Sequence, residues 1–245
     1  MSEDESVLGR AAPAPDRTLA WGALPDQVAD IRFGDAHAAS RPLLAIVHGG
    51  FWRPLYDRMH TAPMAAALAA AGWTVASIEY RRIPGDPDAS VADVRAALAA
   101  LPAQVAGRHR GDVVAIGHSA GGHLALLAGL APTGPLVGVL ALSPLADLGM
   151  TQALGLSRGA AGEFLGCDAD ARADLDPARL RSPAVPTTIL HGDADETVPL
   201  AMSRAYVATH ADVRLRVPRG AGHYAGIDPL SPAWTAVVEE IGRFD

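Results

Sequence analysis

Short apolar runs alternate along the chain with longer segments of helical periodicity. Residues 43–47 contain no polar side chain, a pattern typical of a strand buried on both faces of a parallel sheet. Residues 91–106 instead place apolar side chains every three or four positions, which predicts a helix with one buried face. By the same criteria, strands are predicted at residues 18–21, 28–33, 43–47, 74–80, 113–117, 136–142, 186–190 and 213–217. Helices are predicted at residues 59–71, 91–106, 200–209 and 232–244, with another that begins just after Ser119.

The order of these elements predicts the topology. From residue 43 onward strands and helices take turns, which predicts an α/β fold with a mostly parallel sheet, helices on both faces and right-handed crossovers. The first two strands are joined by a short turn containing Gly22 and Pro25, and they predict an antiparallel hairpin at one edge. In sheets of this kind ligands bind at the carboxyl ends of the strands. We therefore expect the functional residues in the Gly- and His-rich loops that follow the strands.

Composition changes along the chain, and it suggests three parts. Residues 1–16 are acidic and then rich in Ala and Pro, and they predict either a disordered lead or an arm that lies on the surface. Residues 17–245 have the length and apolar content of one large domain. Within it, residues 144–184 are more polar and contain only short helix-like pieces. We interpret this stretch as a small cap-like insertion over the functional site.

Charge and cysteine content narrow the class of protein. The net charge of −7 and the pI near 5.7 argue against binding to nucleic acid. Cys167 is the single cysteine, so no disulfide within the chain and no thiolate metal cluster can form. Residues 1–5 are acidic where a secretory signal would be basic, and no run of about 18 apolar residues occurs. We expect a cytoplasmic protein with a small-molecule substrate and no nucleic-acid or membrane partner, and we leave a homodimer open.

A candidate nucleophile lies between a predicted strand and a predicted helix. Gly117, Ser119 and Gly121 form G-x-S-x-G in the strand–turn–helix context that makes this motif informative. So sharp a turn favours glycine at both flanking positions, and it lifts the serine hydroxyl out of the chain. The alternative is that Ser119 only caps the helix that follows it.

Acyl transfer by a serine also needs a base, and nine histidines are available. His223 is the preferred candidate because it lies in a Gly-rich loop between the last predicted strand and the last predicted helix. The alternative is a surface histidine. His118 and His123 flank the serine, and we interpret both as packing residues.

The acid that orients the base has three candidates. Asp195 follows the strand at 186–190 in the segment H-G-D-A-D-E-T-V-P, where a carboxylate can hold His223 in one tautomer. Asp193 is expected to order the turn through its own backbone. Asp147 follows the preceding strand and stays an alternative, although Asp195 is preferred.

Backbone N–H groups are the expected donors to the developing oxyanion. Ala120 would supply one, and Gly50 and Phe51 would supply one or two more from the loop after residues 43–47. Glycine in that loop allows the backbone to approach the reacting carbonyl closely. His48 is interpreted as a structural residue that tethers the loop.

Taken together, these motifs resemble the α/β-hydrolases of the esterase/arylformamidase group, which includes kynurenine formamidase and small carboxylesterases. The similarity extends from about residue 17 to the end of the chain. It rests on H-G-G-F-W at 48–52, E-Y-R-R at 79–82, G-H-S-A-G-G-H at 117–123, H-G-D-A-D-E-T-V-P at 191–199 and G-H at 222–223. The resemblance implies the α/β-hydrolase fold and hydrolysis of a small ester or an activated amide, such as an N-formyl arylamine. No metal and no organic cofactor are expected.

Substrate contacts are predicted mainly in the loop after His48. Phe51, Trp52 and Tyr224 are expected to line the substrate pocket, with core packing under the loop as the alternative for Phe51 and Trp52. Glu79 is interpreted as a buried loop tether, with a role as an acid as the alternative. The arginines at 81 and 82 are interpreted as solvated, with a substrate carboxylate as their alternative partner.

Two other functions remain open from the sequence. The segment at 191–199 also resembles small aminopeptidase-like hydrolases related to prolyl oligopeptidase. A non-catalytic binding protein on the same fold is the second alternative, because a fold does not determine a function.

Overall fold

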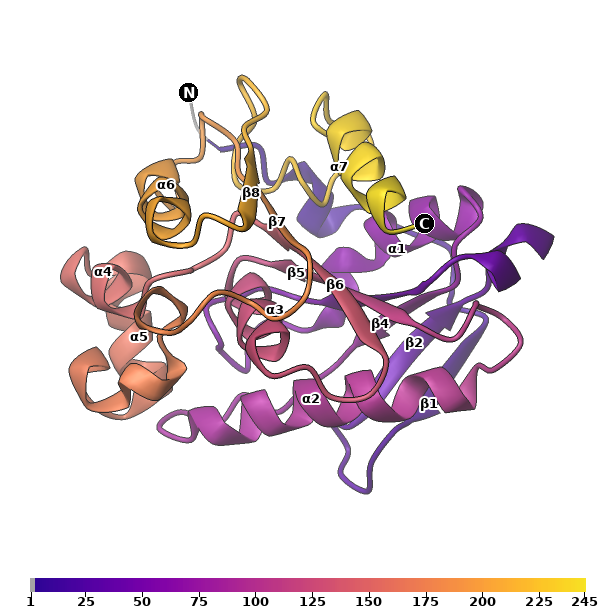
Figure 1. The fold of residues 1–245 in the computed structure, drawn as a ribbon, viewed down its shortest axis with the longest axis horizontal. Helices are drawn as coiled ribbons and strands as arrows, with labels where there is room; N and C mark the ends of the chain where they lie inside the picture. Colours follow the sequence, from indigo (N-terminus) through magenta and orange to yellow (C-terminus); the bar gives the residue numbers. More distant parts are fainter. Residues whose placement is uncertain (1–2) are drawn as a thin grey trace.

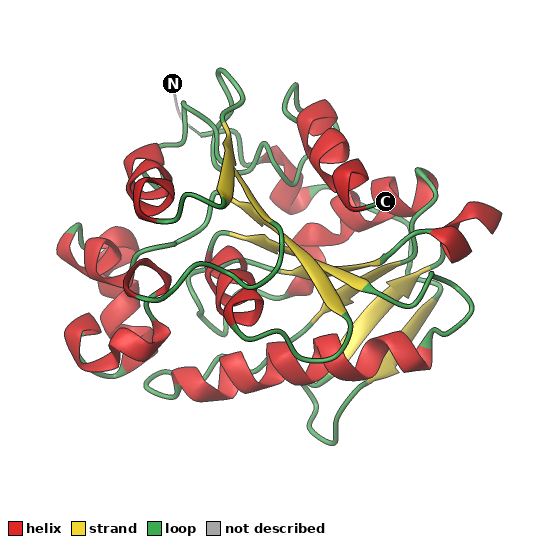
Figure 2. Cartoon of the chain, in the orientation of Figure 1, coloured by secondary structure: helices red, strands yellow, loops and turns green. Residues whose placement is uncertain are grey.

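One eight-stranded sheet forms the centre of the molecule in a computed structural model that describes residues 3–245 (Figures 1 and 2). The strand order is β1-β2-β4-β3-β5-β6-β7-β8. β1 and β2 pair antiparallel, β2 joins β4 antiparallel, and all later pairs are parallel. The predicted α/β fold with its antiparallel edge hairpin is confirmed.

Each predicted strand is present, with small differences at its ends. The strand after residue 74 is shorter than predicted and ends at Ile78, so Glu79 and Tyr80 belong to the loop. The strand before Ser119 includes His118. The strands are β1 (Arg17–Ala20), β2 (Val28–Arg32), β3 (Leu43–Val47), β4 (Val75–Ile78), β5 (Val113–His118), β6 (Leu136–Leu142), β7 (Thr187–Leu190) and β8 (Val213–Arg216).

Helices cover both faces of the sheet, and alternating strand residues show which helix covers which face. Leu44 and Ile46 of β3 pack in one cluster with α1 and α7, whereas Leu43, Ala45 and Val47 pack with α2, α3 and α6. The bounds are α1 (Ala62–Ala70), α2 (Pro87–Gln104), α3 (Ala120–Leu130), α6 (Leu200–Thr209) and α7 (Trp234–Ile241). Within residues 3–245, no helix is both long enough and apolar enough to cross a membrane.

Helix α2 begins four residues earlier than the apolar pattern predicted. The Asp86 side chain accepts a hydrogen bond from Ala89 N (3.3 Å), and Pro87 occupies the first helical position. Asp at the N-cap followed by Pro strongly favours the start of a helix, and the spacing of apolar residues does not reveal this preference. The predicted stripe is buried as expected, and it comprises Val91, Val94, Leu98, Leu101 and Val105.

Residues 144–184 connect β6 to β7 and contain four short helices. Phe164, Leu165 and Leu175 belong to the same apolar cluster as the sheet, so this segment packs on the domain without a separate core. Figure 1 shows α4 and α5 side by side at one end of the molecule. The helices are α4 (Leu148–Ala153), α5 (Leu156–Leu165), η4 (Ala169–Leu175) and η5 (Pro177–Arg179).

Residues 3–16 form an arm along the surface. Its one turn of 3₁₀ helix, η1 (Ser6–Gly9), places Val7 in the apolar cluster on the α1 and α7 face, where Val7 is 1% exposed. Arg10 forms an ion pair with Asp228, with Nη2 to Oδ2 at 3.1 Å. The first two residues of the predicted arm lie outside the described residues.

The tight packing of Gly121 predicts a large loss of stability for Gly121→Ala. A Cβ at this position would lie 2.6 Å from the carbonyl carbon of Val47, where backbone leaves no room to relax. We expect urea unfolding to show a loss of about 3 kcal/mol or more. Gly162→Ala is the matched control because it lies in α5 with nothing within 4 Å, and it is expected to raise stability by up to about 1 kcal/mol. Equal effects of the two substitutions would contradict this account.

Candidate active site

The turn from β5 into α3 carries Ser119 at the carboxyl end of a central strand. Ser119 has φ 54° and ψ −116°, a conformation that costs a non-glycine residue on the order of 1–3 kcal/mol. A Cβ on Gly117 would lie 2.6 Å from the carbonyl carbon of Gly121, so only glycine fits there. The glycines on both sides of the serine are therefore required by space, as the motif predicted.

Ser119 does not act as a helix cap. It occupies the N-cap position of α3, but its side chain makes no capping hydrogen bond. Its backbone N–H donates to Leu142 O of β6 at 2.9 Å, which fixes the turn against the sheet. The hydroxyl is left free to face the pocket that Ser119 lines, so the interpretation as a cap is wrong.

The loops after β7 and β8 bring Asp195 and His223 together. His223 Nδ1 lies 2.8 Å from Asp195 Oδ2, and both side chains are almost fully buried. The two loops approach closely because Gly192 has no side chain. A Cβ there would lie 2.6 Å from the carbonyl carbon of Ala221. The structure thus pairs the predicted base with the preferred acid.

Asp195 is held as a buried carboxylate. Burial acts to raise its pKa, but hydrogen bonds with His191 and His223 outweigh burial and hold the pKa of Asp195 well below its ordinary value. Its Oδ1 accepts the N–H groups of Thr197 (3.0 Å) and Val198 (2.7 Å). His191 Nε2 lies 3.1 Å from Oδ2. A charge satisfied on all sides is suited to orienting His223 and stabilising its protonated form.

The other two acid candidates have structural roles. Asp193 Oδ1 accepts the N–H of Gly220 at 2.6 Å and links the loops after β7 and β8. Asp147 caps α4 by accepting the N–H of Met150 at 2.6 Å. The structure pairs neither with His223.

Ser119 and His223 line one small pocket of about 100 Å³. Within residues 3–245 no hydrogen bond joins Ser119 Oγ to the His223 ring. Such contacts are often long in free enzymes and shorten when substrate binds. The lining residues are Leu8, Gly50, Phe51, Tyr56, His60, His118, Ser119, Ser157, His223 and Tyr224.

The loop after β3 lies directly against the serine turn. A Cβ on Gly49 would be 2.9 Å from His118 O and 3.0 Å from the Ser119 Cβ. Gly50 and Phe51 both have positive φ, 110° and 51°, which turns the loop sharply. In the described chain, the N–H groups of Gly50, Phe51 and Ala120 donate to no backbone or side-chain acceptor. These groups match the predicted oxyanion donors.

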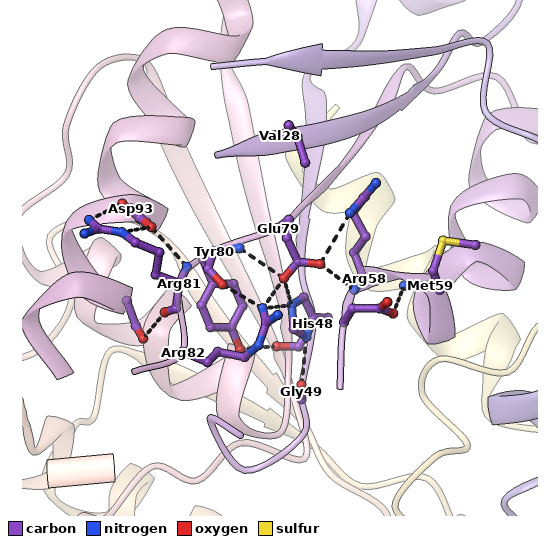
Figure 3. Close-up of polar contacts among 12 residues, drawn as sticks. Val28, His48, Gly49, Arg58, Met59, Glu79, Tyr80, Arg81, Arg82 and Asp93 are labelled. Carbon is purple, nitrogen blue, oxygen red and sulfur yellow. Dashed lines mark hydrogen bonds and ion pairs between the residues drawn. The ribbon is translucent and has the colours of Figure 1, made fainter. Parts of the chain in front are cut away.

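His48 and Glu79 fasten this loop to the end of β4 (Figure 3). His48 Nε2 lies 2.9 Å from Glu79 Oε1, and His48 Nδ1 lies 2.8 Å from Gly49 O. Tyr80 stacks on the His48 ring at 4.5 Å, and its hydroxyl donates to His48 O at 2.9 Å. The sequence-based interpretation of His48 and Glu79 as tethers agrees with these contacts.

Positively charged side chains surround the buried carboxylate of Glu79 (Figure 3). Arg82 pairs with Oε1, and Arg58 Nη1 lies 3.4 Å from Oε2. Burial acts to raise the pKa of Glu79, but hydrogen bonding and charge from His48 and Arg82 lower it to about 2. Arg81 pairs with buried Asp93 at 2.7 Å. The interpretation of Arg81 and Arg82 as solvated is therefore wrong, because both neutralise buried carboxylates.

Trp52 was predicted to line the substrate pocket, but it is not among the residues that line it. It is 3% exposed and stacks on Phe164 at 4.6 Å, with His123 edge-on at 5.2 Å. Core packing, the alternative role for Trp52, is therefore the one observed. Phe51 and Tyr224 do line the pocket.

Three histidines near the serine turn are held neutral. Burial lowers the pKa of His123 to about 4, and its Nε2 lies 2.8 Å from Leu175 O. Burial and the nearby His223 lower the pKa of His118 far below its ordinary value. Burial likewise lowers the pKa of His60 to about 4. His118 Nε2 lies 3.1 Å from His223 O, so the neutral His118 ring holds the backbone of His223 in place.

Four lining residues were not predicted from the sequence: Leu8, Tyr56, His60 and Ser157. Tyr56 and His60 follow the H-G-G-F-W motif closely, and that proximity could have pointed to them. Ser157 comes from α5 and is held by Arg53 Nη1 at 2.7 Å, while Leu8 comes from the arm. No local signal identified these two. In the described residues, no group of three or more His, Cys, Asp or Glu side chains is placed to hold a metal ion.

Comparison with known proteins supports the assignment of the fold. The family model described as BD-FAE matches residues 29–136, which include Gly50 and Ser119 but neither Asp195 nor His223. Esterase 2 of Thermogutta terrifontis superposes with a TM-score of 0.75 at 21% identity, over 97% of this chain and 95% of that one. The chain therefore has the α/β-hydrolase fold.

Two curated relatives from Mycobacterium tuberculosis are described as esterases or ester hydrolases. Esterase LipC is 28% identical over 89% of this chain, and probable carboxylic ester hydrolase LipM is 37% identical over 38% of it. The chain spans 61% of the length of LipC and 22% of the length of LipM. Neither relative singles out the arylformamidase group, so that finer assignment stays a prediction.

The buried Asp195–His223 pair predicts that Asp195→Asn suppresses the reactivity of Ser119. Loss of the charge removes the group that orients His223 and stabilises its protonated form. We expect covalent labelling by a fluorophosphonate probe, followed by intact mass, to slow by about 10³- to 10⁴-fold. Asp193→Asn is the control and should change labelling by no more than a few-fold. A greater loss in Asp193→Asn than in Asp195→Asn would reverse the assignment of the acid.

The depressed pKa of Glu79 predicts a pH-dependent contribution to stability. Because the folded-state pKa of about 2 lies below the ordinary value of 4.5, the charge stabilises the fold above about pH 4.5, and this contribution disappears as pH falls toward 2. At pH 7 Glu79→Gln should lower the free energy of unfolding by about 2–3 kcal/mol. Glu239→Gln removes an exposed charge as a control, and about 0.5 kcal/mol is expected. Urea unfolding of the wild type and both variants from pH 7 to pH 3 measures these differences. A loss of stability in Glu79→Gln that stays the same at every pH would contradict the stabilising role of the Glu79 charge.

Proposed function

We propose that this chain is a serine carboxylic ester hydrolase for substrates with small acyl groups. The observation that carries the proposal is the shared pocket. It is lined by Ser119, which is strained and makes no capping hydrogen bond, and by His223, which buried Asp195 orients. The esterase descriptions of the relatives LipC and LipM and of Thermogutta esterase 2 support it.

The proposed mechanism proceeds through an acyl-serine. His223 Nε2 takes the proton of Ser119 as Oγ attacks the ester carbonyl, and Asp195 stabilises the resulting imidazolium. The N–H groups of Ala120, Gly50 and Phe51 bind the oxyanion. His223 then gives its proton to the leaving alcohol. Water attacks the acyl-serine with His223 again as base, which releases the acid and restores the serine.

The size of the pocket supports a small acyl group. At about 100 Å³ the pocket is smaller than a cavity of roughly 150 Å³ that holds benzene, so it favours an acyl group of only a few atoms. Formyl, acetyl and butyryl groups are of this size, whereas long acyl chains are not. Two structures of Thermogutta esterase 2 are described as propionate-bound and butyrate-bound. An activated amide with a formyl group, as in an N-formyl arylamine, is the finer alternative that the motifs suggest.

A comparison of substrates tests the proposal. We expect hydrolysis of p-nitrophenyl acetate and butyrate to exceed that of p-nitrophenyl octanoate by at least about tenfold in kcat/KM, because a longer chain does not fit. Ser119→Ala should remove hydrolysis while leaving the unfolding curve close to that of the wild type. N-formylkynurenine and an aminoacyl anilide are assayed beside the esters.

Each outcome distinguishes the alternatives. A preference for N-formylkynurenine over acetate esters would establish the formamidase alternative with the same mechanism. A preference for the aminoacyl anilide would favour an aminopeptidase-like enzyme. Absence of turnover on all substrates, together with no labelling of Ser119 by a fluorophosphonate, would leave a binding protein.

A further inference from the structure

The N-terminal arm reaches the loops that carry the acid and the base (Figure 1). Glu3 Oε1 accepts the backbone N–H of His223, and Oε2 accepts the backbone N–H of Glu196 at 3.0 Å. The hydroxyl of Thr197 lies 3.4 Å from Oε2. One carboxylate therefore connects the loop after β7 with the loop after β8.

The chain around this contact is shaped to receive the carboxylate. A side chain at Gly222 would collide with Glu3 Oε1, so glycine at this position leaves the space that Glu3 fills. The N–H groups of Thr197 and Val198 are taken by Asp195 itself, and that of Glu196 is taken by Glu3. The acid loop thus offers three successive N–H groups to two carboxylates.

The arm is anchored independently of Glu3. Val7 is buried in the apolar core beside α1 and α7, and Arg10 pairs with Asp228. Between the two anchors, Leu8 forms part of the pocket wall. The anchors limit how far Glu3 can move from the two loops, so its hydrogen bonds cost little further ordering of the chain.

We propose that Glu3 is a positioning residue for the catalytic pair, and this inference rests on the proposed function. By binding the N–H of His223 and the N–H next to Asp195, its carboxylate sets the register of the two loops and so the direction of the imidazole toward Ser119. Hydrogen bonds to a charged acceptor are stronger than neutral ones, so a carboxylate suits a bridge between two backbone donors. Glu3 does not line the pocket and makes no contact with the reacting atoms.

Kinetics of Glu3→Gln and Glu3→Ala test the role. Misplacement of a catalytic base by a fraction of an ångström lowers kcat, so we expect kcat for p-nitrophenyl acetate, counted per active site titrated with a fluorophosphonate, to fall by roughly 10- to 100-fold in Glu3→Ala. The loss should be smaller in Glu3→Gln, because the amide oxygen still accepts one bond. KM should change by less than about threefold, because the pocket keeps its lining.

Asp4→Asn is the matched control. It removes the same charge from the adjacent residue, but Asp4 bonds only within the arm, to Ser6 N at 2.9 Å. It should retain the kcat of the wild type. Equal kcat in Glu3→Ala and the wild type would overturn the proposal, and so would an equal loss of kcat in Asp4→Asn. It would also be overturned if Glu3→Ala lowered only the number of active sites that can be titrated and left kcat per titrated site unchanged.

Hydrogen–deuterium exchange tests the contact without reference to activity. Peptides that cover residues 193–198 and 220–225 should exchange faster in Glu3→Ala than in the wild type, with no change in Asp4→Asn. Unchanged exchange would refute the bridge even if the enzyme is active. Faster exchange in a protein that hydrolyses no ester would support the bridge and reject only the proposed function.

Discussion

The site depends on a close approach between two backbone segments, the end of β3 and the turn after β5. Gly121 of the turn lies against the carbonyl groups of Val47 and His48, and Gly49 of the loop lies against His118 and Ser119. Side chains at these glycines would push the segments apart. Without those side chains the loop with Gly50 and Phe51 lies against the serine turn, and these two residues line one pocket with the strained Ser119. The order of strands in the sheet makes this approach geometrically available, since β3 and β5 are neighbours.

Two of the buried carboxylates, Asp195 and Glu79, lie near that approach, and each is satisfied by a different set of partners. Asp195 is surrounded by backbone N–H groups and two imidazoles, and its charge remains available to His223. Glu79 is surrounded by His48 and arginines, and its charge holds a loop in place. A buried charge is stable only when it is paired and hydrogen-bonded. Both carboxylates lie on loops at the carboxyl edge of the sheet. Because several strands end there, backbone donors and side chains from distant parts of the sequence lie close together at this edge.

The pocket walls come from segments that have little else in common. Tyr56 follows the loop after β3, Ser157 belongs to the segment between β6 and β7, and Leu8 belongs to the arm. Arg53 joins the loop after β3 to Ser157, so this loop and the segment between β6 and β7 are linked directly. The size of the pocket is therefore a property of the assembled edge and of no single motif.

The sequence by itself was sufficient for the alternation of strands and helices, the strand–turn–helix around Ser119 and the expectation that Asp195 and His223 lie together, which the structure shows. These features depend on local periodicity and on short motifs whose residues are adjacent, which is the information that a chain displays in one dimension. Only the tertiary structure decided that Trp52 packs on Phe164, that Arg81 and Arg82 neutralise Asp93 and Glu79, and that Glu3 reaches the loops after β7 and β8. Each of these contacts joins residues whose meeting depends on how loops turn after the sheet has formed. No periodicity encodes that, whether the partners lie three residues apart, as Glu79 and Arg82 do, or 220 residues apart, as Glu3 and His223 do.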